Sequence, residues 1–181
     1  MEYITINQKT IVADKGLHNY SEGHNLYAAY VKALKSNHKK IGFDEHAENL
    51  LDCCCCCTIK ERTETRGEIN LVILTAEELG LQSETETMFE DNEIIKAGEK
   101  IGFHACPAEV GVELTLQYAV PLGEYWIIGM PTLGVGHPYR RGNILRDMFV
   151  CKKNELSTWW FTWRFNDNKD QKGIMKFVFM I

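Results

Sequence analysis

The sequence predicts an α+β fold in which N-terminal helices pack on a C-terminal antiparallel β-meander of about five strands. Apolar residues recur at helical spacing within residues 21–40, whereas from residue 110 to the end they alternate with other residues. The connections between the predicted C-terminal strands are mostly short, which favours pairing of consecutive strands. A length of 181 residues, with 45% hydrophobic and 25% charged residues, suits a single globular domain.

The N-terminal third is predicted to form a hairpin and two helices. Residues 2–6 and 10–13 are β-prone, and the first long helix ends at Gly42, a residue that readily adopts a left-handed cap conformation. Asp44 can cap the second helix, which runs into five consecutive cysteines. Polar residues 58–68 would link two possible subdomains, 1–57 and 69–181.

The middle of the chain is predicted to hold a buried strand followed by two capped helices, the first of them short. Residues 69–75 form a nearly continuous apolar run. Thr75 and Glu78 have the spacing of a capping box, and Gly80 would end that short helix. A second capping box, Thr87 to Glu90, opens a helix that should end at Gly102.

Alternating apolar residues predict a sheet in the C-terminal part. The predicted strands are residues 110–120, 125–130, 145–152, 159–165 and 174–181. The fourth strand carries alternating aromatic residues that we expect to pack beneath the helices: Trp159, Phe161, Trp163 and Phe165.

Several motifs resemble a family of small bacterial proteins. They are a Cys-Pro-Ala-Glu-Val-Gly run at residues 106–111, Leu-Thr-Leu-Gln-Tyr at 114–118, Gly-Glu-Tyr-Trp at 123–126 and Phe-Val-Phe at 177–179. The resemblance covers roughly residues 69–181. It implies a bacterial or phage-like origin and does not indicate a mechanism. Val112 and Thr115 stand where the family carries a proline and a basic residue, so a role of that basic residue would not transfer.

Composition excludes several classes of function. The net charge of −5 argues against broad affinity for nucleic acids or anionic membranes. No stretch approaches the ~20 apolar residues needed to cross a bilayer, and the N-terminus has no secretory signal. Seven cysteines, five of them consecutive, do not form a spaced disulfide framework. We therefore expect a cytoplasmic protein with reduced thiols and no cofactor.

The first candidate site places an imidazole, a thiol and a carboxylate close together in sequence, at His104, Cys106 and Glu109. A nucleophilic cysteine needs a nearby base to form the thiolate, and the base needs an orienting group. The alternative is structural: Cys106 is an inert core residue, and Pro107 starts a helix that includes Glu109.

The second candidate site is a glycine-rich loop at residues 131–144. Glycines let backbone amides approach an anion, and basic or hydroxyl side chains can bind it. The predicted ligand-binding residues are Tyr139, Arg140 and Arg141 in the loop and Arg146 just after it, which would extend the basic patch, with His137 as an acid or base. The alternative is a solvated surface loop.

The third candidate site is the cysteine run at residues 53–57. On a helix, Cys53 and Cys56 would lie three residues apart on one face and could ligate a soft metal ion. Metal sites usually show spaced cysteine pairs, so the alternative is a helix end in which small apolar cysteines pack on the core.

Two functional hypotheses follow. The first is a non-enzymatic binding domain whose sheet and 131–144 loop contact a protein or a small anionic ligand. The second is a small hydrolase or transferase for a phosphate-bearing substrate held by that loop, with His104 or His137 as acid or base.

Overall fold

The computed structural model describes residues 1–7, 41–43, 47, 68–81, 91–107, 109–131, 133–135, 145–153, 155–160 and 174–181. Within these ranges the chain forms one β-sheet and two short helices, α3 (Asp91–Lys100) and α4 (Glu109–Gln117). The strands are β1 (Glu2–Asn7), β2 (Gly42–Phe43), β3 (Glu68–Thr75), β4 (Glu124–Ile128), β5 (Leu133–Val135), β6 (Leu145–Lys152), β7 (Glu155–Trp160) and β8 (Ile174–Met180).

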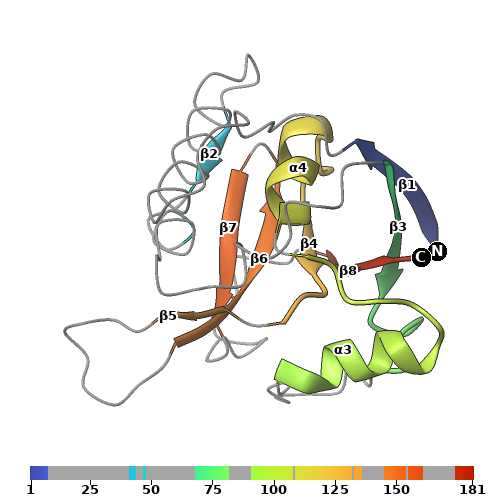
Figure 1. Ribbon diagram of the computed structural model, residues 1–181. Helices are drawn as coiled ribbons and strands as arrows, with labels where there is room; N and C mark the ends of the chain where they lie inside the picture. Colours follow the sequence, from blue (N-terminus) through green and yellow to red (C-terminus); the bar gives the residue numbers. More distant parts are fainter. Residues whose placement is uncertain are drawn as a thin grey trace, which may run out of the picture.

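The sheet has the strand order β1-β3-β8-β4-β6-β7-β2, and β5 pairs with β6 off this path (Figure 1). Two neighbouring pairs, β8–β4 and β7–β2, are parallel, while the other pairs are antiparallel. The sheet is therefore mixed. Strand β1 belongs to the same sheet as the strands from residue 68 onward, so the two predicted subdomains share one sheet.

The predicted fold of N-terminal helices on an antiparallel meander is wrong. The chain begins with a strand, the sheet contains parallel pairs, and only two short helices occur among the described residues. Most residues of the two predicted N-terminal helices lie outside the described ranges, apart from a helical, fully buried Ala47. Gly42, the predicted helix cap, lies in strand β2 instead.

The first predicted hairpin is only half observed. Strand β1 forms where residues 2–6 predicted a strand, but its partner is β3, which lies far along the chain. Residues 10–13, the predicted second strand of the hairpin, lie outside the described ranges. Local sequence therefore located this strand, while its pairing depends on a distant part of the chain.

The predicted strand at residues 110–120 is instead the helix α4 followed by a loop. Apolar residues alternate with others in this segment, which predicted a strand with one buried face. The prediction failed because the intervening residues are buried as well. Gly111, Glu113 and Thr115 are as inaccessible as their apolar neighbours, so α4 is enclosed on all sides and shows no amphipathic period. The amide of Gln117 donates to the Glu113 carboxylate at 2.9 Å, an (i, i+4) contact that the helix creates.

The last strand does not close a meander. Strands β6 and β7 form the predicted hairpin, but β8 lies between β3 and β4 in the middle of the sheet. Phe177, Val178 and Phe179 are all fully buried, so both faces of β8 are covered. A strand with apolar residues on both faces is stabilised by a central position, whereas an edge would leave part of it exposed.

The predicted aromatic face falls mostly beyond the end of β7. That strand stops at Trp160. The residues of the face that lie outside the described ranges are Phe161, Trp163 and Phe165. Their packing beneath the helices therefore stays a prediction.

Two cap predictions are confirmed. The Thr75 hydroxyl accepts from the Glu78 amide at 3.2 Å, and the Glu78 carboxylate accepts from the Thr75 amide at 2.9 Å. Gly80, with φ of 71°, ends this single turn. At the end of α3, Gly102 has φ of 94°, and the Phe103 amide donates to the Gly98 carbonyl, which completes a Schellman cap.

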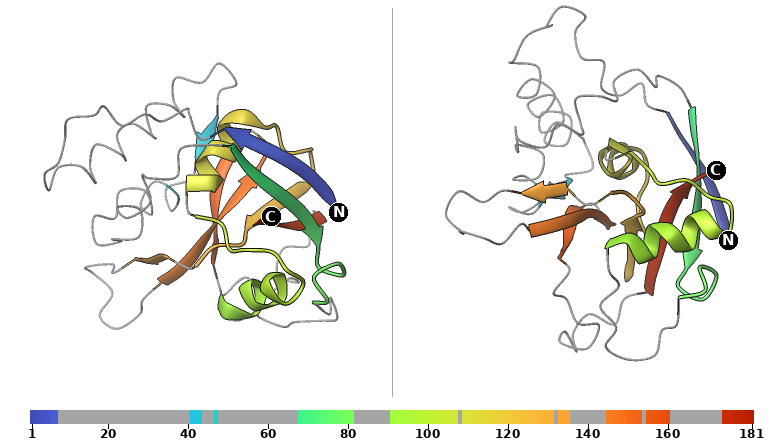
Figure 2. Two further views of the ribbon diagram at one scale, coloured as in Figure 1. Left: turned by 45° about the vertical axis from the view of Figure 1, so that its right-hand side comes forward. Right: turned by 60° about the horizontal axis from the view of Figure 1, so that its bottom comes forward.

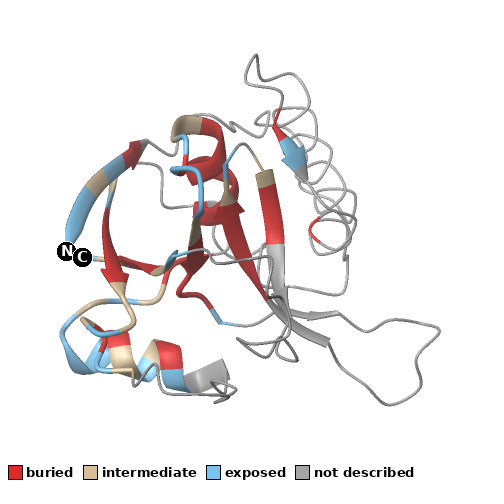
Figure 3. Ribbon diagram, turned by 180° about the vertical axis from the view of Figure 1, so that it is seen from behind, coloured by how far each residue is buried: buried red, intermediate tan, exposed pale blue. Residues whose placement is uncertain are grey.

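The two helices cover opposite faces of the sheet (Figure 2). Gly98 of α3 packs on Phe179, and Gly111 of α4 packs on Phe149. Strand register places Phe177 opposite Ile127 and Ile127 opposite Val150, so these three side chains share one face. Phe179, two residues after Phe177, lies on that same face, whereas Phe149, next to Val150, lies on the other. Residues 71–74 of β3, 126–128 of β4, 148–151 of β6 and 177–179 of β8 are buried, while β1 is largely exposed (Figure 3). The core thus has two apolar layers with the sheet between them.

Candidate functional site

The first predicted site contains two side chains in different environments. His104 is exposed, and its main chain exchanges hydrogen bonds with Met180 at 2.8 and 2.9 Å. Cys106 is fully buried, and its thiol donates to the Val178 carbonyl at 3.4 Å. Burial, followed by the nearby Cys151, raises the pKa of the Cys106 thiol, which disfavours the thiolate that nucleophilic catalysis needs. Glu109 is the first residue of α4.

The other predicted site residues lie mainly outside the described ranges. Arg146, the predicted ligand-binding residue just after the loop, lies in β6, where its backbone pairs with Gly134 of β5. The loop residues outside the described ranges are His137, Tyr139, Arg140 and Arg141, and the cysteines outside them are Cys53 and Cys56. The anion-binding and metal-binding assignments therefore stay predictions. Among the described residues, no group of three or more His, Cys, Asp or Glu side chains could hold a metal ion.

Strand β1 lies at one edge of the described sheet, at the right of Figure 1, and no strand of the described residues pairs with its outer side. It has six residues, whereas β2 at the opposite edge has two and β5 has three. Natural edges are usually protected from pairing by short length, proline, lysine or bulges. The β1 sequence, Glu-Tyr-Ile-Thr-Ile-Asn, contains neither proline nor lysine. Within the described part of the chain, this edge is thus longer and carries fewer of these protective features than the two short strands.

A single hydrogen bond determines the phase of the β1 edge, meaning which of its residues direct their backbone N–H and C=O groups outward. The Ile181 amide donates to the Asn70 carbonyl at 3.0 Å, so the polar backbone groups of Asn70 point toward β8. In an antiparallel ladder both backbone groups of a residue point to the same side. Asn70 is opposite Thr5, so the N–H and C=O of Thr5 point away from β3, and so do those of Tyr3. The alternate residues Ile4 and Ile6 bond to β3.

One side chain reaches this free edge. The hydroxyl of Tyr118, just after the end of α4, donates to the Thr5 carbonyl at 3.0 Å. The Thr5 side chain is engaged elsewhere, because its hydroxyl donates to the Asn70 side-chain oxygen at 2.9 Å. Tyr118 therefore occupies one of the outward acceptors of β1 and leaves the Tyr3 backbone groups open among the described contacts.

Exposed apolar side chains flank the edge. Met1 is 63% exposed, Tyr3 61% and Ile181 57%. Tyr3 lies opposite Val72, and Thr5 is opposite Asn70, to which Ile181 is bonded. Because side chains two residues apart on a strand share a face, Met1, Tyr3 and Thr5 lie on one side of the sheet. Exposed apolar groups beside open backbone groups are typical of a protein contact surface.

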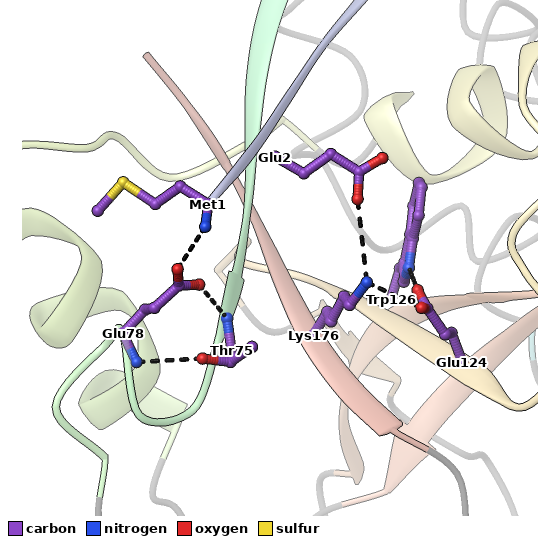
Figure 4. Close-up of polar contacts among 7 residues, drawn as sticks. All are labelled: Met1, Glu2, Thr75, Glu78, Glu124, Trp126 and Lys176. Carbon is purple, nitrogen blue, oxygen red and sulfur yellow. Dashed lines mark hydrogen bonds and ion pairs between the residues drawn. The ribbon is translucent and has the colours of Figure 1, made fainter.

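A polar network holds the beginning of β1 in place (Figure 4). Glu2 lies 3.9 Å from the Lys176 ammonium group, which donates to Glu124 at 2.8 Å. The other oxygen of Glu124 accepts from the Trp126 indole N–H at 2.7 Å. The network therefore connects the edge strand β1, through an ion pair, to β8 and β4 in the centre of the sheet.

The same corner of the molecule holds a second set of contacts. The N-terminal ammonium group and the Thr75 amide both donate to the Glu78 carboxylate. These donors hold the pKa of Glu78 below its ordinary value. Burial raises the pKa of Glu124, but the hydrogen bonds from Lys176 and Trp126 outweigh burial and lower it overall. Both carboxylates are thus held ionised as acceptors, which suits a structural role.

No protein family, curated protein or solved structure matches this chain. None of the described helices combines the length and apolar character required of a membrane span.

Proposed function

We propose that this protein is a non-enzymatic interaction domain that binds an extended protein segment at the free edge of β1. In this mode of recognition, called β-strand addition, main-chain hydrogen bonds supply affinity and alternate side chains supply specificity. The observation that carries the proposal is the outward orientation of the Tyr3 and Thr5 backbone groups on a six-residue edge strand that has no strand partner on its outer side among the described residues.

Three further observations support the proposal. The exposed side chains of Met1 and Tyr3 lie beside the edge, where a bound segment would cover them. Pairing with β3 orders β1 before binding, and an ion pair of Glu2 with Lys176 connects it to β8, which reduces the conformational entropy lost on association. By contrast, the thiol of Cys106 is buried in an environment that keeps it protonated.

The experiment that tests this function uses a phage-displayed library of random heptapeptides selected on the whole chain. Selected peptides are synthesised, and their binding is measured by fluorescence anisotropy. We expect β-prone sequences with alternating side chains. Thr5→Pro removes an outward N–H without removing a backbone hydrogen bond to β3, although the side-chain bond from Thr5 to Asn70 is lost. We expect it to weaken binding at least about tenfold.

A matched control separates the edge from general exposure. Leu122 is 81% exposed in the turn before β4, outside the edge strand. Leu122→Ser should leave peptide binding unchanged. Failure to select any peptide, or equal binding by the wild type and Thr5→Pro, would show that β1 is not the contact surface.

A further inference from the structure

The proposed function does not specify which protein supplies the bound strand. The sequence of β1 itself indicates one candidate. Resting on that function, we propose that the segment accepted by β1 is β1 of a second copy of this chain. The two strands would run antiparallel about a two-fold axis at Ile4. Such an interface uses the same surface on both copies and is the commonest kind in homo-oligomers.

The phase of the edge restricts the register of this pairing. Outward residues must face outward residues, so Tyr3 can lie opposite Tyr3, Thr5 or Asn7 of the second copy. With Tyr3 opposite Thr5, Ile4 faces its own counterpart, and residues 1–7 of both copies are all paired. The other two registers leave one end of the described strand without a partner. The Ile4-centred register therefore makes the most complete ladder.

The side chains also fit this register. Tyr3 meets Thr5 of the second copy in both halves of the interface, and pairs of an aromatic with a β-branched residue stabilise sheets. Ile4 meets Ile4 on the other face. The strand carries one charged residue, Glu2, which would lie opposite Ile6, so no acidic side chain directly faces another. A strand that pairs well with itself is thus already present at the open edge.

Tyr118 acts against this pairing. The Thr5 carbonyl would accept from the Tyr3 amide of the second copy, but the Tyr118 hydroxyl already donates to that oxygen. A carbonyl has two lone pairs, so both bonds can coexist at reduced strength, or Tyr118 must move. Removing the hydroxyl should therefore strengthen self-association, a result that a general loss of structure would not produce.

The test is sedimentation velocity of the full chain over a range of protein concentrations. We expect a reversible dimer for the wild type, because one pair of edge strands makes a small interface. Tyr118→Phe should lower the dissociation constant about three- to tenfold, and Thr5→Pro should raise it at least about tenfold. Tyr125→Phe removes a tyrosine hydroxyl on β4 and serves as the matched control, with no change expected.

The outcomes separate the two proposals. If the wild type and Tyr118→Phe both remain monomeric while selected peptides still bind in a manner sensitive to Thr5→Pro, self-pairing is overturned and strand addition stands. If a dimer forms with the same dissociation constant in Thr5→Pro, its interface lies elsewhere and the inference fails. If neither dimer nor peptide binding occurs, both proposals fall. Circular dichroism of each variant verifies that it is folded.

Discussion

Glu124 shows how a single residue can link the stability of the sheet to pH. Its carboxylate accepts from Lys176 at 2.8 Å and from the Trp126 indole at 2.7 Å, and both donors favour the ionised form. Since the pKa of Glu124 is lowered in the folded state, the ionised group stabilises the fold at pH values above its unfolded pKa. That contribution is lost as the pH falls through the folded pKa.

We expect Glu124→Gln to reduce the free energy of unfolding by about 1–2 kcal/mol at neutral pH, because hydrogen bonds to a charged acceptor are lost. The variant should also show a smaller loss of stability on acidification than the wild type. Urea unfolding at a series of pH values measures both effects. Glu77→Gln, at an exposed position, is the control; equal pH slopes for wild type and Glu124→Gln would refute the assignment.

Gly98 is a residue whose small size is required by packing. A Cβ atom at this position would lie 2.7 Å from Cδ1 of Phe179, and the aromatic ring is fully buried. Alanine ordinarily stabilises a helix by about 1 kcal/mol relative to glycine. We expect Gly98→Ala instead to destabilise the protein by about 1–3 kcal/mol through overpacking.

The matched substitution on the exposed side of α3 is Glu99→Ala. Because Glu99 is exposed, we expect this substitution to change the free energy of unfolding of the protein by less than about 0.5 kcal/mol. Thermal and urea unfolding of both variants measures the difference. A Gly98→Ala protein as stable as Glu99→Ala would mean that Phe179 moves aside without cost.

At the scale of elements, β1 offers a test of its own phase. Ile4 bonds to β3, whereas Thr5 points its backbone outward. Proline removes an N–H, so Ile4→Pro should break the β1–β3 ladder and cost about 1–3 kcal/mol. Thr5→Pro should cost about 1 kcal/mol, less than Ile4→Pro, since proline is tolerated at outward edge positions and only the side-chain hydrogen bond to Asn70 is lost. Chemical denaturation compares them; the reverse ranking would mean that the phase is inverted.

The helix α4 shows where the sequence pattern was insufficient. Val110, Val112, Leu114 and Leu116 alternate like a strand, and only the burial of the residues between them reveals why. Thr115 donates to the Gly111 carbonyl at 2.8 Å and contacts the Cys151 sulfur at 3.2 Å, so even the polar positions are enclosed. The helix-start signal at Pro107 was the better guide, because a fully buried helix loses its 3.6-residue period.

The candidate edge could be predicted only in part. Residues 2–6 are β-prone, so the existence of β1 follows from local sequence. Which of its backbone groups face outward depends on pairing with Asn70, far along the chain, and the contact of Tyr118 with Thr5 depends on the position of α4. No local pattern contains that information. The caps at Thr75 and Gly102 were predictable because their physics lies within a few residues.

For the whole molecule, the strand order makes folding depend on long-range contacts. Strand β1 pairs with β3, and β3 and β4 both pair with β8 at the end of the chain. Local signals predicted that residues 174–181 form a strand but could not place it in the centre of the sheet, because that choice depends on which faces other elements cover.

Such pairing predicts slow folding. Closing long loops costs entropy before the contacts that compensate for it have formed, and proteins dominated by non-local pairs fold on the order of milliseconds to seconds. Stopped-flow refolding followed by tryptophan fluorescence measures the rate, since Trp126 is buried in the folded state. Refolding within microseconds would be inconsistent with this topology.

The shortness of β2 and β5 has a consequence for the size of any assembly. A sheet with two long edge strands, both able to pair, could add molecules without limit and grow into a fibre. Here the opposite edge strand β2 has two residues, and β5 has three. If two molecules pair through β1, the one long edge strand of each described sheet is then covered, and only the short strands β2 and β5 remain at its borders. The complex would be closed, and its growth would stop at a pair.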